Sequence, residues 1–414
     1  MLKSLNRRLV TLAVASSLAS TAVAQNLSGD LVIFLDTSNP APRATFEAMI
    51  ADFQALNPDL SIETTIIDRE AYKTQIRNFL TANPPDVATW YAGNRMQPYV
   101  EPGLFEDVSD LWEGELSEQM ASAKASMTLD GKQWGVPYSY YQWGVYYRAD
   151  IYQELGLSEP TNFAEMKANC QAILDSGRKC YTIGTKFLWT AAGWFDYLNL
   201  RTNGYEFHMD LTAGRVSWED PRVRQTFANW QELIDMGAFI DNHTAYSWQE
   251  AIPFIVDGSA AAYLMGNFAV AAILDAGLDE SQLDFYQFPV ITEGIPLAEE
   301  APTDTLHIPA NAANKDNARA FLRYVTSAEV QTEINAALGQ LPVNNQSSVD
   351  TSDKFVVQGF EMLNNAYALA QFFDRDVTGE MANLGMQAFQ EFMVRPNQLD
   401  AILSRLETAR QRIY

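Results

Sequence analysis

The chain has 414 residues, of which 47% are hydrophobic, and a formal net charge of −24 at pH 7. Such an acidic protein is repelled by phosphate backbones and by anionic lipid surfaces, which argues against nucleic acids and membrane surfaces as partners. The length exceeds what one hydrophobic core usually organises, so it predicts two lobes.

The first residues have the pattern of an export signal. Lys3, Arg7 and Arg8 form a positive start, 9–18 is a short apolar run, and Ala22-Val23-Ala24 is typical of a cleavage site. The apolar run is too short for a membrane helix, and no later run reaches the length of about 18 residues that such a helix needs. Residues 1–24 are therefore predicted to be a signal peptide cleaved after Ala24, which places the mature protein in a bacterial periplasm.

Strand and helix patterns alternate from residue 31 onwards. Strands are predicted at 31–35, 61–67 and 87–90, with helices between them at 42–56 and 72–80. The first of these helices places Phe46, Met49, Ile50 and Phe53 on one face. This βαβαβ order predicts a parallel sheet that is covered by helices on both faces.

The rest of the chain is predicted to be richer in helix. A helix at 220–236 begins with an Asp-Pro pair, and a buried strand at 260–265 ends at a glycine. No repeat, low-complexity tract or linker divides the chain, so we expect it to cross between two lobes more than once. Further helices are predicted at 162–176, 248–256, 317–326, 328–338, 355–364, 379–393 and 398–410, and further strands at 181–183, 285–290 and 305–308.

The two cysteines, Cys170 and Cys180, lie ten positions apart. In an oxidising compartment they are predicted to pair and to tie the 162–176 helix to the 181–183 strand. Two buried free thiols are the alternative. The spacing does not suit zinc, which favours closer cysteine pairs with further ligands.

The sequence contains no catalytic or metal-binding motif. It lacks the nucleophile elbow, the zinc-protease motif, the phosphate loop, the dinucleotide fingerprint and the Cys-x-x-Cys pair. His208, His243 and His307 lie far apart, without metal-ligand spacing, and are predicted to be structural. Two carboxylates could hydrolyse a glycosidic bond, but among 52 acidic residues close pairs arise by chance. The sequence favours binding without catalysis, with no cofactor and no metal.

Two of the predicted strands end in small polar turns. The strand at 87–90 is followed by Asn94 and Arg95, and the strand at 260–265 by Gly266, Asn267 and Phe268. Ligands of parallel α/β sheets lie beyond the carboxyl ends of the strands. These five residues are therefore candidate ligand residues.

Aromatic residues concentrate in two runs, 137–147 (PYSYYQWGVYY) and 186–197 (KFLWTAAGWFDY). A partly exposed Tyr or Trp offers a flat apolar face with a polar rim, which suits the ring and the hydroxyls of a sugar. Tyr141 and Trp189 are predicted to face either a ligand or the core. Trp194 and Tyr146 are predicted to pack in the core.

The segment FFDRDVTGE (372–380) combines aromatic and charged residues. Asp374 and Arg375 could point into a cleft, where a carboxylate accepts hydrogen bonds from sugar hydroxyls and a guanidinium donates to them. Alternatively, Asp376 caps the helix that follows. A solvated turn is a third interpretation.

Five motifs, in order along the chain, resemble the extracellular solute-binding proteins of bacterial sugar ABC importers, a family that includes the maltose-binding protein. They are LVIFLDTS (31–38), PPDVATWYAGNRMQPYVEPGLFEDV (84–108), GKQWGVPYSYYQWGVYYRADIYQELGL (131–157), DGSAAAYLMGNFAV (257–270) and ANKDNARAFLRYVTSAEVQTEINAALGQLPVN (313–344). The resemblance implies an α/β, two-lobe periplasmic-binding-protein fold of type II, with several crossovers and a ligand cleft between the lobes.

The resemblance also implies how the chain divides and what it meets. Residues 25–139 and 286–340 are expected to form the N-terminal lobe, and residues 140–285 and 341–414 the C-terminal lobe. Closure of the lobes around a sugar would be read by the transmembrane subunits of an ABC permease, which a partner ATPase drives. The protein is expected to be a monomer.

Compared with the maltose-binding protein, the expected ligand groups carry less charge. Asn94-Arg95 stands in place of an Asp-Arg pair, Ser38-Asn39, beside Thr37, in place of an Asp-Lys pair, Tyr141 in place of a glutamate, and Phe268 in place of a stacking tryptophan. A ligand other than a maltodextrin is therefore predicted.

The sequence thus predicts the periplasmic binding component of an importer, capturing a mono- or disaccharide or a sugar derivative. A secreted carbohydrate-active enzyme, such as a glycosidase, is the alternative outside this class. Within the class, Arg95 and Arg375 leave open an anionic ligand such as a sugar acid or a sulfonated sugar.

Overall fold

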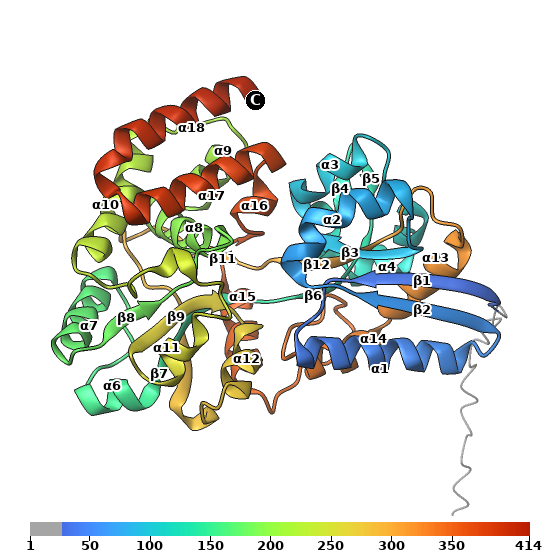
Figure 1. Ribbon diagram of the computed structural model, residues 1–414, viewed down its shortest axis with the longest axis horizontal. Coiled ribbons are helices and arrows are strands. Elements are labelled where there is room, and N and C mark those ends of the chain that lie inside the picture. The colour runs from blue at the N-terminus through green and yellow to red at the C-terminus, as the bar shows by residue number, and fades with distance from the viewer. Residues whose placement is uncertain (1–26) are drawn as a thin grey trace, which may run out of the picture.

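The computed structural model describes residues 27–414, so the predicted signal peptide at 1–24 lies outside the described residues. Figure 1 shows two α/β lobes side by side, joined by segments that cross between them. No helix within 27–414 combines the length and the apolar composition needed to cross a membrane.

The N-terminal lobe is built on a five-stranded sheet in the order β2-β1-β3-β12-β6. The first three strands of the chain are parallel, as the βαβαβ pattern predicts, and β12 is antiparallel to both its neighbours. The predicted helix face at Phe46, Met49, Ile50 and Phe53 is buried in the core of this lobe. Its elements are β1 (Gly29–Leu35), α1 (Pro40–Leu56), β2 (Leu60–Ile66), α2 (Arg69–Ala82), β3 (Val87–Tyr91), the 3-10 turn η1 (Gly93–Met96), α3 (Gln97–Val100), α4 (Glu115–Gln119), α5 (Ala121–Lys124), β4 (Thr128–Leu129), β5 (Lys132–Gln133), β6 (Val136–Tyr140), β12 (Thr303–His307), α13 (Lys315–Val325) and α14 (Ala328–Leu338).

The C-terminal lobe has a four-stranded sheet in the order β10-β7-β9-β8, surrounded by most of the helices. Trp194 and Tyr146 are fully buried in its core, as predicted. Its elements are β7 (Trp143–Arg148), α6 (Ala149–Leu155), α7 (Phe163–Asp175), β8 (Lys179–Thr182), α8 (Trp189–Asn203), α9 (Tyr205–Thr212), α10 (Pro221–Asp235), α11 (Ile252–Val256), β9 (Ala260–Gly266), α12 (Ala269–Asp275), β10 (Leu283–Tyr286), β11 (Glu299–Glu300), α15 (Lys354–Asn365), β13 (Leu369–Ala370), α16 (Phe373–Asp376), α17 (Gly379–Val394) and α18 (Leu399–Ile413).

The chain passes between the lobes after β6, after β11 and after α14. Two of these crossings pair with each other: the backbone N of Tyr140 donates to the carbonyl of Leu341 (3.1 Å), and the N of Leu341 donates to the carbonyl of Tyr140 (3.0 Å). Two hydrogen-bonded strands bend together more readily than they separate, so this pair is a suitable hinge. The predicted lobe boundaries at 139/140, 285/286 and 340/341 stay a prediction.

Three predictions about local structure are wrong. The strand predicted at 285–290 is β10, which ends at Tyr286, because the chain leaves the sheet there and Val290 pairs instead with Thr161 and Phe163 of the same lobe. The helix predicted from 248 begins at Ile252, with a proline in its first turn. Thr378, not Asp376, caps α17, because its hydroxyl accepts from the backbone N of Met381 (3.4 Å).

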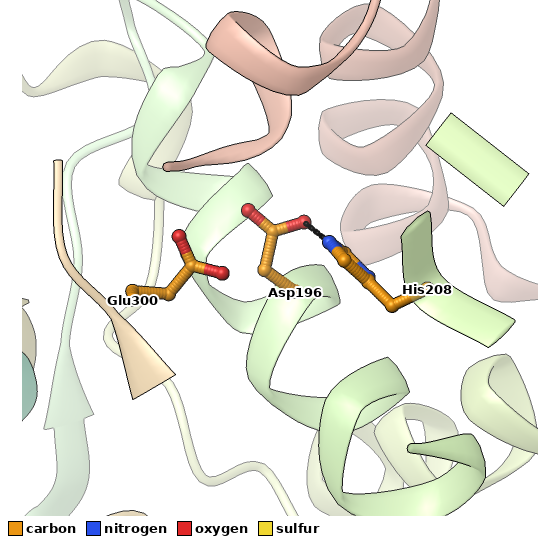
Figure 2. Close-up of side chains that lie close together, drawn as sticks. All are labelled: Asp196, His208 and Glu300. Atoms are coloured by element: carbon orange, nitrogen blue, oxygen red, sulfur yellow. Dashed lines mark ion pairs between the residues drawn. The ribbon is translucent and has the colours of Figure 1, made fainter. Parts of the chain in front are cut away.

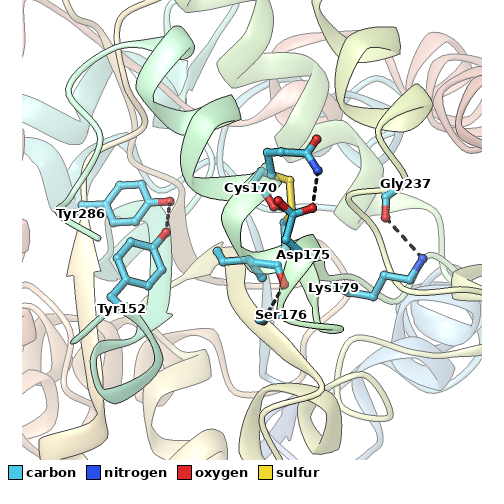
Figure 3. The surroundings of a disulfide bond; sticks show 10 residues. Tyr152, Cys170, Asp175, Ser176, Lys179, Gly237 and Tyr286 are labelled. Carbon is cyan, nitrogen blue, oxygen red and sulfur yellow. Dashed lines mark hydrogen bonds between the residues drawn. A yellow bond between two sulfur atoms is a disulfide. The ribbon is translucent and has the colours of Figure 1, made fainter. Parts of the chain in front are cut away.

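The predicted disulfide between Cys170 and Cys180 is present, with a Cα–Cα distance of 5.2 Å. It joins the middle of α7 to β8, and both residues are buried (Figure 3). The bond therefore ties a surface helix to the edge strand of the C-terminal sheet.

Replacing both cysteines, as Cys170→Ala/Cys180→Ala, is expected to lower the free energy of unfolding by about 2–3 kcal/mol, because the loop that the bond closes is short. Urea denaturation measures the change. Reducing agent should bring the unmodified protein to the midpoint of the double variant and leave the variant unchanged. Equal midpoints for the reduced and oxidised unmodified protein would contradict the prediction.

His307 is a fully buried histidine at the end of β12. Its ring stacks on Phe105 with 4.4 Å between the centroids, its Nδ1 lies 2.7 Å from the carbonyl O of Trp134, and its Nε2 lies 2.7 Å from the Oγ1 of Thr305. Burial lowers the pKa of His307 to about 4, because the ring has lost its hydration. It is a neutral part of the core at physiological pH.

The stability of the protein is expected to depend on pH through His307. Between pH 6.5 and about 4 the unfolded chain binds a proton that the folded chain does not, so folding stability falls as the pH falls. The loss is at most about 1.4 kcal/mol per pH unit. Urea denaturation of the protein and of His307→Gln across this range should show a shallower decline for the variant. Because the other titrating groups are common to both proteins, parallel curves would refute the prediction.

Candidate ligand-binding cleft

Two neighbouring cavities open between the lobes, and we call them together the cleft. The larger one, about 370 Å³, is lined by Thr37, Arg69 and Asp304 from the N-terminal lobe and by Trp248 and Phe268 from the other. The smaller one, about 50 Å³, lies beside it, since Arg69 and Phe268 line both. Its other lining residues include Tyr91, Tyr141, Trp143, Trp189, Phe372 and Arg375.

The N-terminal lobe supplies a polar wall to the cleft. Thr37 follows the carboxyl end of β1, Arg69 begins α2 just after β2, and Tyr91 ends β3. The carboxyl ends of these parallel strands meet at one edge of the sheet, which is where α/β folds bind ligands. The hydroxyl of Tyr91 donates to Asp36 Oδ2 (3.2 Å), so the strand ends are also tied to one another.

Each cation that lines the cleft, among the described residues, is paired with a carboxyl group. The pairs are Arg375 Nη2 with Asp304 Oδ1 (3.0 Å), Arg69 Nε with Asp36 Oδ2 (3.6 Å), and Lys73 Nζ with Glu70 Oε2 (2.7 Å). Arg375 also donates to the carbonyl of Thr303 (2.7 Å) and to the hydroxyl of Tyr141 (3.2 Å). Within residues 27–414, the cleft therefore has no free cation to receive an anion.

Two buried polar atoms in the cleft lack a partner among the described residues. They are the hydroxyl of Thr37 and the indole Nε1 of Trp143, in side chains that are 4% and 2% exposed. Buried donors and acceptors are usually satisfied, because leaving one unpaired costs free energy. These two atoms thus have hydrogen-bonding capacity that the protein itself does not use.

The C-terminal lobe supplies an aromatic wall with Phe268 at its centre. The ring of Phe268 lies 5.2 Å from Trp248, 5.3 Å from Tyr141 and 6.2 Å from Trp189, between centroids. Phe268 and Trp189 are only half-buried, so part of each ring faces the cleft. Such faces pack against the C–H groups of a flat, polar ring.

The structure brings six of the predicted site residues to the cleft: Thr37, Tyr141, Trp189, Phe268, Asp374 and Arg375. Ser38 is half-buried next to Thr37. Gly266 lies behind the aromatic wall, where a Cβ atom would come within 2.5 Å of the Phe268 ring and 2.9 Å of Trp143 Nε1. A glycine there lets the two rings approach the strand.

The other predicted residues hold the lobes together. Asn94 donates to the carbonyl of Asp376 (2.9 Å), and Arg95 pairs with Asp374 (2.9 Å). Asn267 is buried at the hinge, where its amide donates to the carbonyl of Gly339. Contact of these residues with a ligand stays a prediction.

A further cavity of about 540 Å³ lies on the opposite face of the crossing strands. Tyr140 and Thr303 line it, whereas the residues that follow them, Tyr141 and Asp304, line the cleft. Successive residues of a strand point to opposite faces, which explains the separation.

At the edge of this further cavity, Gly93 has φ +70°, and a Cβ there would lie 2.6 Å from the carbonyl oxygen of Arg375, so this contact requires glycine.

Sequence reasoning missed several residues of the cleft. Trp143 could have been found, since it lies in the 137–147 aromatic run. So could Asp36, the partner of Arg69, which directly follows the first strand in LVIFLDTS. Arg69, Trp248 and Asp304 carry no local signal. They reach the cleft only because the lobes meet there.

Asp196, His208 and Glu300 form a fully buried cluster behind α16, with Asp196 in the middle (Figure 2). Their spacing would suit a metal ion, but the hydrogen bonds argue against it. The carbonyl oxygen of Asn199 accepts from Thr226 and Asn203, so its amide donates to His208 Nδ1 (3.0 Å). The ring proton must then sit on Nε2, 3.8 Å from Asp196 Oδ1, so a hydrogen and not a lone pair faces the acids.

The protonation states of these three residues also argue against a metal ion. Burial lowers the pKa of His208 to about 3 and raises the pKa of Asp196 and of Glu300 well above their usual values. The cluster is thus a neutral imidazole facing two carboxyl groups that favour their protonated forms.

Comparisons with known proteins agree with this architecture. The profile of the bacterial extracellular solute-binding proteins matches residues 37–332. An uncharacterized ABC transporter extracellular-binding protein of Pyrococcus horikoshii is 21% identical over 319 residues, which are 75% of this chain and 71% of that protein.

Solved structures are similar over nearly the whole chain. The bacterial solute receptor AcbH, which has an exclusive preference for β-D-galactopyranose, superposes with a TM-score of 0.86 at 26% identity, covering 93% of this chain and 99% of the receptor. A protein studied for xylan utilization by Caldanaerobius polysaccharolyticus has a TM-score of 0.84 at 21% identity, covering 93% of this chain and 100% of its own. The predicted two-lobe fold is confirmed, and the chain belongs to the bacterial extracellular solute-binding protein family.

Proposed function

We propose that this protein is the periplasmic binding component of an ABC importer and that it captures a neutral mono- or disaccharide in the cleft. One observation carries the proposal: a polar wall and an aromatic wall, each with one unpartnered hydrogen-bonding group, face each other across the gap between two lobes. A sugar ring needs both surfaces, one for its hydroxyls and one for its C–H face.

The charge pairs favour a neutral sugar over an anionic derivative. An anion would have to draw Arg69 or Arg375 away from the carboxyl group that now neutralises it. The Arg375–Asp304 pair is buried, and breaking a buried pair leaves an uncompensated charge, which is costly. The preference of AcbH for a galactopyranose supports the same ligand class.

The family also supports a proposal about where the protein acts and how it delivers the sugar. Export through a signal peptide cleaved after Ala24, action as a monomer, and docking on permease transmembrane subunits are parts of the proposal. So is the absence of catalysis, because the family consists of binding proteins and a secreted glycosidase has no support from the relatives.

Neutral hexoses, pentoses and disaccharides are expected to include at least one ligand that raises the melting temperature, whereas sugar acids do not. A ligand at 100 times its Kd adds about 2.7 kcal/mol of stability, because it binds only the folded state. Thermal-shift screening detects this. Chromatography of the recovered sugar checks for turnover. Stabilisation by sugar acids alone would overturn the neutral-sugar proposal, and any product would overturn binding without catalysis.

Thr37→Val is expected to weaken sugar binding about tenfold without destabilising the unliganded protein, because the deleted hydroxyl is buried and unpartnered. Titration calorimetry measures the affinity, and urea denaturation measures the stability. Thr326→Val is the matched control, since its buried hydroxyl donates to the carbonyl of Leu322 (3.0 Å) within the same lobe. That variant should lose stability and keep its affinity. An unchanged affinity for Thr37→Val would mean that the hydroxyl does not contact the ligand.

A further inference from the structure

Phe372 has a strained backbone at the wall of the cleft. Its φ of 150° and ψ of 148° lie in a region that only glycine enters readily. Its ring packs against Trp143 with 4.7 Å between the centroids, and both rings line the smaller cavity. A residue held in such a conformation needs a structure around it that prevents relaxation.

Two carboxyl groups hold the backbone on either side of this residue. Asp376 Oδ2 accepts from the backbone N of Gln371 (3.1 Å) and of Phe372 (3.3 Å). Asp196 Oδ2 accepts from the N of Phe373 (2.8 Å). Three successive amide groups therefore point at two acids, an arrangement that fixes the direction of each peptide plane.

Asp196 is rigidly placed for this role. It is fully buried on α8, with His208 on one side and Glu300 on the other (Figure 2). Among the described residues, its Oδ1 has no hydrogen-bond partner. Its Oδ2 accepts the bond from the backbone N of Phe373. The buried cluster thus supports the 371–373 backbone from behind.

The segment that follows reaches both the cleft and the other lobe. Asp374 pairs with Arg95, and Arg375 pairs with Asp304 at the floor of the cleft. A rotation of the Phe372 backbone would move its ring, Asp374 and Arg375 together, because all three lie within one short turn.

We propose that Asp376 and Asp196 are positioning residues of the cleft, which hold the backbone at 371–373 so that Phe372 packs on Trp143 and α16 presents Asp374 and Arg375. This role rests on the proposed ligand-binding function of the cleft. The two acids act through Phe372 and α16 and touch no ligand themselves.

A first experiment tests the strain without any ligand. Phe372→Gly and Phe372→Ala both delete the ring, but only alanine keeps the Cβ atom that makes this φ unfavourable. Phe372→Gly is therefore expected to unfold at a higher urea concentration than Phe372→Ala, the reverse of the usual order of these residues. If the alanine variant is as stable as the glycine variant or more so, the backbone is not held under strain and the proposal is wrong.

A second experiment measures affinity at pH 8 with the best sugar found by the thermal-shift screen. Burial raises the pKa of Asp376 to about 7, so the group is mostly ionised there. Asp376→Ala is expected to weaken binding about tenfold, the equivalent of one hydrogen bond to a charged group. Asp376→Asn retains an acceptor oxygen and should restore most of the affinity. Asp196→Leu, which keeps the branched shape and the number of side-chain heavy atoms, should weaken binding as Asp376→Ala does.

Asp353→Ala is the matched control, because Asp353 also accepts from two backbone N–H groups, at the start of α15, and lies outside the cleft. It should lose stability and bind as the unmodified protein does. Full affinity in Asp376→Ala, or equal losses in Asp376→Asn and Asp376→Ala, would overturn the proposal. If the unmodified protein binds no sugar, the proposed function fails, and the glycine–alanine comparison still tests whether the backbone at Phe372 is held under strain.

Discussion

The guanidinium of Arg375 is the contact on which the cleft depends. Arg375 is 6% exposed, and its guanidinium reaches the carbonyl of Thr303, the carboxyl group of Asp304 and the hydroxyl of Tyr141. Its Cζ lies 4.7 Å from the ring centre of Tyr91. These partners come from β12, from the first crossing segment and from β3, so one charged group fixes three parts of the chain to α16. A buried charge is stable only when it is paired and hydrogen-bonded, so the loss of one partner would destabilise the whole arrangement.

The two walls of the cleft divide the task of recognition. The N-terminal lobe carries Thr37, Arg69 and Asp304. The C-terminal lobe carries most of the aromatic rings together with Arg375, whose charge is balanced by Asp304 across the cleft. Neither wall alone offers what a sugar ring needs, so recognition requires both lobes. The pairing of Arg95 with Asp374 and the bond from Asn94 to Asp376 show that the lobes are in direct contact beside the cleft.

Local patterns in the sequence predict local structure well and the meeting of distant segments poorly. The alternation of residues 31–91 predicts β1, α1, β2, α2 and β3 nearly to their ends, because hydrophobic period alone distinguishes them. The disulfide is confirmed as well. In the cleft, Trp189 and Phe268 could be anticipated as exposed aromatic faces. The partner of Asp374 could not, because Arg95 reaches it only across the gap between the lobes. The error at Asp376 has the same origin: its carboxyl group is used by the strained turn at 371–372 and not by the helix that follows.

The position of β12 makes the two lobes one unit of folding. It lies between β3 and β6 and pairs with both, yet in the chain it follows nearly all of the strands of the C-terminal lobe. A fragment ending after β6 would therefore present the unpaired edge of β3, a strand that is buried along its whole length in the native sheet. Bare edges of this kind recruit other chains. Two lobes that look separable in space thus cannot be cut apart as independent modules.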